Sequence, residues 1–209
     1  MTNEFLVLTA IRLILPFFLL RWPIATFLVS IVVDTEDFDY LNLQTTADYD
    51  FYQQWDKMID TYFLGFLAFV AWRWKDKIAK RIAIFFFLYR LAGVILQTVT
   101  GNREFLFWFP SFLPLLFIMY FVFWKISGTY NFFDSKKNTV IILFSILFPT
   151  IVQEFFMHIK MSPPADVFGI PRYFVGPLDV SFWAPWVMLP MLPVFVVLWK
   201  VKKAKVGKK

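Results

Sequence analysis

The sequence predicts an all-α fold, a polytopic bundle of transmembrane helices. Of the 209 residues, 59% are hydrophobic and 22% are aromatic, which is far more apolar than an ordinary soluble domain. The apolar residues also form runs of about 20, the length that a helix needs to cross a hydrocarbon layer roughly 30 Å thick. We therefore expect a single integral membrane domain over residues 1–209, with a basic tail at 200–209.

Five apolar runs after residue 50 have the length of a membrane span. They cover residues 52–73, 79–99, 105–126, 138–159 and 181–201.

The N-terminal apolar run, residues 4–33, is longer than one span requires and is interrupted by Arg21-Trp22-Pro23. Proline is tolerated at the start of a helix and disrupts its interior, so we expect two helices here, 4–20 and 23–42. This gives about seven helices in all. A single kinked helix, which would give six, is the alternative.

Basic residues mark one side of the predicted bundle. They gather in the loops at 72–81 and 125–138 and in the tail after Trp199. By the positive-inside rule these segments are cytoplasmic. We therefore expect an integral protein of the plasma membrane whose C-terminus lies inside the cell. The acidic segment after the second helix then lies outside. The net charge of +6 is then a topology signal, and no nucleic-acid partner is expected.

The acidic segment is the strongest candidate for a functional site. Eight of the fifteen acidic residues lie between positions 34 and 60, with Lys57 the only basic residue among them. Asp34 and Asp37 are three residues apart and Asp56 and Asp60 are four apart, so each pair shares one helix face. Clustered carboxylates in a medium of low dielectric either take up protons or hold a cation. Because the chain has no cysteine, a hard divalent cation, Mg²⁺, Mn²⁺ or Ca²⁺, fits such a site best.

Four further ionisable residues lie inside predicted spans: Arg12 in the first, and Arg90, Glu154 and His158 at a depth similar to that of Asp60. Such residues are costly in a membrane and generally face a cavity or a partner. We expect them to bind a substrate, with the two arginines holding phosphate in their planar forks. The alternative is structural: the aspartates would pair with Arg12, Arg90 and Lys57, and His158 would be a hydrogen-bonded surface histidine.

The spacing Asp34-x-x-Asp37 at the end of one helix, followed by Asp56-x-x-x-Asp60 near the start of the next, resembles the CDP-alcohol phosphatidyltransferases. The N-terminal "NEFLVLTAIRLILP" is similar to that family's early Asn, Leu-Thr-x-x-Arg and Pro. The resemblance covers about residues 3–65. It implies that Asp34, Asp37 and Asp56 bind a divalent metal and that Asp60 deprotonates the acceptor alcohol.

Several positions depart from the family pattern. Phe38 stands where the family has its first Gly, Leu41-Asn42 where it has Ala-Arg, and Phe51 or Tyr52 where it has its second Gly. The family uses a cytosolic CDP donor, whereas the basic loops here put the aspartates outside.

Three functions therefore remain open from the sequence. The first is a metal-dependent, phosphotransferase-like enzyme that acts on a lipid-linked or phosphorylated head group among the membrane lipids. The second is a cation- or proton-coupled transporter, for which a homodimer could supply the second half. The third is a non-catalytic membrane partner protein whose aspartates are structural.

Overall fold

The computed structural model describes residues 3–41, 46–128, 132–133, 135–160, 174–175 and 178–179. Within these ranges, the side chains of 35–41, 46–50, 53, 126–127, 157, 160 and the two short strands are not described. The predicted span at 181–201 and the tail at 200–209 lie outside the described residues.

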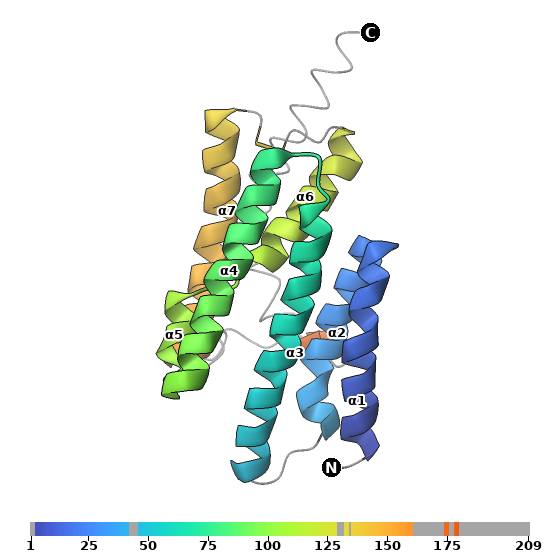
Figure 1. The fold of residues 1–209 in the computed structure, drawn as a ribbon, viewed down its shortest axis with the longest axis vertical. Coiled ribbons are helices and arrows are strands. Elements are labelled where there is room, and N and C mark those ends of the chain that lie inside the picture. Colours follow the sequence, from blue (N-terminus) through green and yellow to red (C-terminus); the bar gives the residue numbers. More distant parts are fainter. Residues whose placement is uncertain are drawn as a thin grey trace.

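The described part of the chain is a bundle of helices, as predicted (Figure 1). Its helices are α1 (Asn3–Ile14), the 3₁₀ helix η1 (Leu15–Leu20), α2 (Pro23–Leu41), α3 (Thr46–Trp72), α4 (Lys77–Thr100), α5 (Glu104–Trp108), α6 (Leu113–Ser127), α7 (Lys136–Phe155) and the π-helix η2 (Phe156–Lys160). Two short antiparallel strands follow, β1 (Phe174–Val175) and β2 (Leu178–Asp179).

Four helical segments are long and apolar enough to cross a membrane: Asn3–Leu20, Lys77–Thr100, Glu104–Lys125 and Lys136–Phe155. The apolar part of α2, Pro23–Asp34, is shorter. Helix α3 covers the predicted span at 52–73, but its first half carries Asp56, Lys57 and Asp60 and it is not one of the four. The described residues therefore form a helical membrane protein whose most charged helix needs partners for its polar side chains.

The N-terminal run folds as two antiparallel helices. Arg12 in α1 contacts Asp34 in α2 at 2.7 Å, whereas residues 22 positions apart in one continuous helix would be about 33 Å apart. The chain reverses at Arg21 and Trp22, immediately before Pro23. The expectation of two helices is confirmed, and the single kinked helix is wrong.

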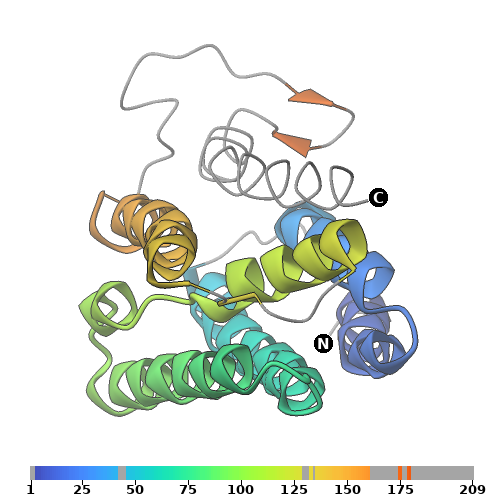
Figure 2. The ribbon, with the colours of Figure 1, turned by 90° about the horizontal axis from the view of Figure 1, so that it is seen from above.

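Helix α3 lies in the middle of the bundle. Seen from above, α1 and α2 are on one side, α4, α5 and α7 are on the other, and α3 lies with α6 between them (Figure 2). The core beside α3 includes Leu67 and Ala71 of α3, Ala83 of α4, and Leu116 and Phe117 of α6, all 0% exposed. The second half of α3 thus contributes to the core, whereas its charged first half lies next to α1 and α2.

The two basic loops lie at the same end of the bundle (Figure 1). The side chain of Asp76, just before α4, accepts hydrogen bonds from the backbone N–H groups of Ile78 and Ala79, so it caps the helix. Its second oxygen accepts the N–H of Phe132, from the loop before α7, at 2.9 Å. This bond joins the loop at 72–81 to the loop at 125–138, as their predicted common side requires.

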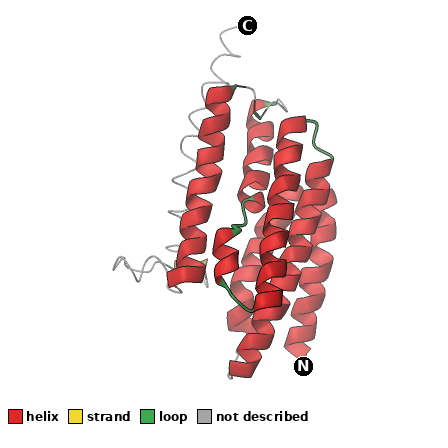
Figure 3. Cartoon of the chain, turned by 60° about the vertical axis from the view of Figure 1, so that its left-hand side comes forward, coloured by secondary structure: helices red, strands yellow, loops and turns green. Residues whose placement is uncertain are grey.

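The predicted helix at 105–126 is interrupted, and this corrects the sequence-based expectation. Helix α5 ends at Trp108 and α6 begins at Leu113, with Pro110 in the connection (Figure 3). Proline has no N–H and disfavours the helical conformation of the residue before it, and Phe109 has φ −119° and ψ 67°. The apolar run continues across this break, so hydropathy alone could not reveal it.

Candidate functional site

The guanidinium of Arg12 lies among three aspartates. Its Nη2 atom donates hydrogen bonds to Asp34 Oδ1 at 2.7 Å and to Asp60 Oδ1 at 2.8 Å, and its Nη1 atom donates to Asp56 Oδ1 at 3.1 Å. Lys57 adds a second cation, 2.8 Å from Asp56 Oδ2 and 3.8 Å from Asp60 Oδ2. We call these five residues the Arg12 cluster.

Three helices position the Arg12 cluster. The antiparallel turn at residues 21–22 brings Asp34 of α2 beside α1. Asp56 and Asp60 are one turn apart on α3, so both carboxylates face the same side of that helix. The Arg12 guanidinium also lies 5.1 Å from the ring centre of Trp55, a cation–π contact that fixes the arginine from its apolar side.

Exposure differs sharply within the cluster. The side chain of Arg12 is 7% exposed and that of Asp56 is 12% exposed, whereas Asp34 is 49% and Asp60 is 37% exposed. Phe5, Leu8, Tyr52 and Ile59 are buried beside Trp55 as a separate apolar cluster. The Arg12 cluster is therefore packed against these apolar residues on one side and is accessible at two of its three carboxylates.

The geometry suits a cation. One carboxylate oxygen from each of Asp34, Asp56 and Asp60 can be chosen so that all three lie within 4.8 Å of one another. Oxygen donors at this spacing are the ligands that Mg²⁺, Mn²⁺ and Ca²⁺ take in proteins. Three carboxylates against Arg12 and Lys57 also leave a formal charge of −1 in the cluster. The acidic group could thus hold a metal ion, although Arg12 contacts the same three side chains.

The fourth predicted aspartate lies in α2, three residues after Asp34. The side chain of Asp37 is outside the described residues, so its predicted place as a metal ligand stays a prediction.

A second ionic group lies where α5, α6 and α7 meet α4. Arg90 Nη1 lies 3.3 Å from Glu154 Oε1, and His158 Nε2 lies 2.9 Å from Glu154 Oε2. All three residues are buried. We call Arg90, Glu154 and His158 the Arg90 cluster. It confirms that Glu154 and His158 are neighbours, but places them with Arg90 and not among the described contacts of Arg12.

The Arg90 cluster stabilises the interrupted helix. Arg90 donates to the backbone carbonyls of Leu106 and Phe109, each at 2.9 Å, and Glu154 accepts the N–H of Ser111 at 2.9 Å. These backbone groups have lost helical partners at the break, and an unsatisfied backbone group in a membrane costs several kcal/mol. The arginine and the glutamate together replace the missing helical bonds.

The sequence contained a signal for this arrangement. Pro110 predicts a break in its helix, and an arginine in the neighbouring span is a natural donor to the carbonyls that the break exposes. The identity of those carbonyls, Leu106 and Phe109, could not be read from the pattern.

The predicted site residues thus form two groups, with Asp34, Asp56 and Asp60 around Arg12 in one of them and Glu154 and His158 beside Arg90 in the other.

No family model matches the chain, and neither does a curated protein or a solved structure. The likeness of residues 3–65 to the CDP-alcohol phosphatidyltransferases stays a prediction.

Proposed function

We propose that this protein is a divalent-metal-dependent membrane enzyme that acts on a phosphorylated lipid head group, with chemistry like that of the CDP-alcohol phosphatidyltransferases. The observation that supports the proposal most is the set of three carboxylates, from two helices, whose oxygens come within 4.8 Å of one another. They lie in a helical bundle with four segments that could span a membrane. In this proposal a lipid reaches the site from within the bilayer.

The donor set fits Mg²⁺ or Mn²⁺. Asp34, Asp56 and, by its place one turn further along α2, Asp37 would hold the ion. Once bound, the ion would neutralise phosphate charge that otherwise repels an attacking hydroxyl. Because Asp34 and Asp60 are partly exposed, they give both the ion and the substrate a route to the cluster.

Arg12 takes a double role in this proposal. Without a cation, its guanidinium compensates the charge of the three aspartates through the hydrogen bonds described above. A cation at the same oxygens would compete with those bonds and leave the guanidinium to donate to phosphate oxygens, for which its planar fork is suited.

Asp60 would accept the proton of the attacking hydroxyl. It is the half-exposed carboxylate on α3, and Lys57 and Arg12 both lie beside it. A general base must lie within hydrogen-bonding distance of the proton that it removes, and Asp60 meets this need for a hydroxyl that enters from the exposed side of the cluster.

The basic loops support an orientation for this site. They lie at the end of the bundle opposite to the N-terminus of α1 (Figure 1), so the positive-inside rule would put the Arg12 cluster in the outer half of a plasma membrane. The substrate would then be a lipid of the outer leaflet.

The proposal is tested by Mn²⁺ binding to the purified protein in detergent, followed by electron paramagnetic resonance. We expect one Mn²⁺ per chain in the wild type and loss of binding in Asp56→Asn/Asp60→Asn. Glu104→Gln is the matched control, because it removes an exposed acid at the same end of the bundle without touching the cluster. Absence of Mn²⁺ binding in the wild type, or equal loss in the control, would overturn the metal-dependent mechanism.

A cation-coupled transporter is the second candidate, and the interrupted α5–α6 segment favours it. Discontinuous transmembrane helices form the ion and substrate sites of many transporters, and Phe109–Phe112 separates α5 from α6 within a segment of membrane-spanning length. Uptake of a labelled cation into sealed vesicles that contain the protein would favour this function. Head-group turnover without uptake would favour the enzyme.

A further inference from the structure

The loop between α3 and α4 carries an excess of positive charge. Residues 72–81 contain five basic residues and a single acid, Asp76. The carboxylate of Asp76 is engaged by the backbone: one oxygen accepts two N–H groups from the start of α4, and the other accepts the N–H of Phe132 in the next basic loop. The acid of this loop therefore serves the fold, and the basic side chains around it keep their charge.

Two of these cations lie against exposed aromatic rings. The guanidinium of Arg73 is 4.7 Å from the ring centre of Phe69, and Lys80 Nζ is 5.6 Å from that of Trp72. Phe69 is 48% exposed and Trp72 is 61% exposed, so both rings belong to the outer surface of the described bundle. A ring attracts a cation over its face but does not neutralise its charge. Within the described residues, neither cation forms an ion pair with a carboxylate.

The packing of the loop fixes these cations in place. Trp74, between the two rings in sequence, is buried and stacks on Tyr120 of α6 with ring centres 3.8 Å apart. The bond from Phe132 to Asp76 holds the loop from the other side. A site whose groups are already fixed loses less conformational entropy when it binds a partner.

Helix α4 gains no stability from the cations at its start. Lys77 and Lys80 lie at its N-terminal end, and its first turn has no acidic residue. The positive end of the helix dipole lies there, so a cation is unfavourable at this position. An anionic partner at the surface of the bundle gives these cations a role that the helix itself does not.

We propose that Arg73 and Lys80 bind the phosphate of an anionic phospholipid in the cytoplasmic leaflet. The positive-inside rule assigns the end of the bundle with the basic loops (Figure 1) to the cytoplasmic side, where the membrane surface is anionic. An exposed tryptophan such as Trp72 is typical of the membrane interface, and Phe69, nearer the middle of α3, would contact the chains of the same lipid. Neither cation belongs to the Arg12 cluster, so this lipid site does not depend on the proposed metal site.

The test uses photolabelling of the full chain in vesicles without divalent cations. The probes are phosphatidylglycerol and phosphatidylcholine, each with a diazirine near the glycerol end of one acyl chain. Phosphatidylcholine carries the same phosphate, but its quaternary ammonium balances the charge. We expect phosphatidylglycerol to label residues 66–81 about fivefold more than phosphatidylcholine, the factor for about 1 kcal/mol, which one basic residue near the surface supplies. Both probes should label residues 99–108, near the other end of the bundle, equally.

Two variants locate the preference. Arg73→Gln/Lys80→Gln should bring the labelling ratio at residues 66–81 close to one. Arg103→Gln is the matched control, because it removes an arginine at the other end of the bundle (Figure 1), and it should keep the wild-type ratio. A wild-type ratio near one would overturn the inference. So would an unchanged ratio in the folded double variant, since other basic segments would then carry the preference.

A measurement on the wild type alone gives a second test. The screening length falls from about 10 Å at about 0.1 M salt to about 3 Å at about 1 M salt. Because Arg73 is exposed and Lys80 is partly exposed, the labelling ratio should fall towards one at the higher salt concentration. A preference that does not change with salt would show that charge is not its cause and would overturn the inference.

Discussion

The two ionic clusters differ in charge balance and in partners. The Arg12 cluster has three carboxylates against two cations, and two of those carboxylates are 37% and 49% exposed. The Arg90 cluster has one carboxylate facing one arginine and one histidine, is buried, and uses backbone groups of the α5–α6 break as further partners. A balanced, buried cluster bonded to backbone serves the fold. An unbalanced, accessible cluster of side chains alone has capacity for a ligand.

This contrast predicts the largest loss of stability at Arg90. Arg90→Met keeps the approximate bulk of the side chain but leaves Glu154 and the carbonyls of Leu106 and Phe109 without their donor. Removal of one partner from a buried ion pair costs about 3–5 kcal/mol. We expect a large fall in the thermal unfolding midpoint in detergent.

The control for this prediction is Arg21→Met, at an exposed arginine between η1 and α2. Arg90→Met/Glu154→Met should recover part of the lost stability, because it leaves no unpaired buried charge. A stable, folded Arg90→Met protein would contradict the structural role of the cluster.

A smaller loss of stability is expected where α4 packs against the break between α5 and α6. A Cβ atom on Gly93 would lie 2.3 Å from the Cβ atom of Phe109, too close for both to stay in place. Gly93→Ala should therefore destabilise the protein by about 1–3 kcal/mol, the usual cost of overpacking. Gly65→Ala is the matched control, since its nearest neighbour outside α3 would be 3.9 Å away. Equal unfolding midpoints for the two variants would argue against the close contact at the break.

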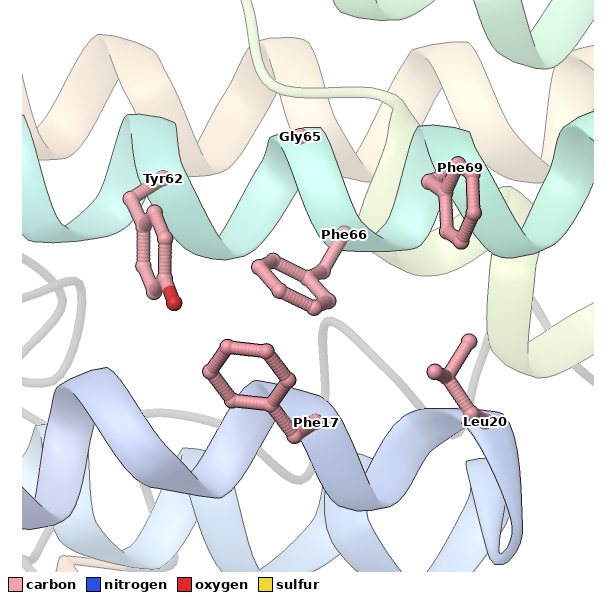
Figure 4. Close-up of a pocket in the computed structure, with 6 residues that line it drawn as sticks. All are labelled: Phe17, Leu20, Tyr62, Gly65, Phe66 and Phe69. Atoms are coloured by element: carbon pink, nitrogen blue, oxygen red, sulfur yellow. The ribbon is translucent and has the colours of Figure 1, made fainter.

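The smallest loss of stability is expected at Tyr62, whose side chain reaches from α3 towards the N-terminal segment (Figure 4). Tyr62→Phe removes the hydrogen bond to the Leu13 carbonyl and leaves the ring in place. The expected cost is about 1 kcal/mol, seen as a small fall in the unfolding midpoint. Tyr89→Phe, which removes the bond from Tyr89 to the Trp108 carbonyl, provides a comparison on the other side of the bundle. A loss at Tyr62 as large as that at Arg90 would show that this hydrogen bond is as important to the fold as the Arg90 cluster.

The sequence predicted the helical membrane fold and the shared helix face of Asp56 and Asp60 because both follow from local patterns. Apolar runs reveal helices, and spacings of three and four residues reveal a shared face. The sequence could not distinguish the two roles of its arginines, since Arg12 and Arg90 have the same charge and both lie inside predicted spans. Their difference depends on long-range contacts, with carboxylates 22 to 48 residues away for Arg12 and with freed backbone carbonyls for Arg90.

The measurement that tests the account most directly is the Mn²⁺ affinity of Arg12→Gln beside that of the wild type, with folding checked by size-exclusion chromatography. Arg12 donates to Asp34 and Asp56, which are proposed to hold the cation, and to Asp60, the proposed base. If guanidinium and metal compete for these oxygens, Arg12→Gln should bind Mn²⁺ more tightly, and Mn²⁺ should raise its unfolding midpoint more than that of the wild type. A folded Arg12→Gln protein with unchanged or weaker Mn²⁺ binding would contradict the account and leave the Arg12 cluster, like the Arg90 cluster, as a structural ion pair.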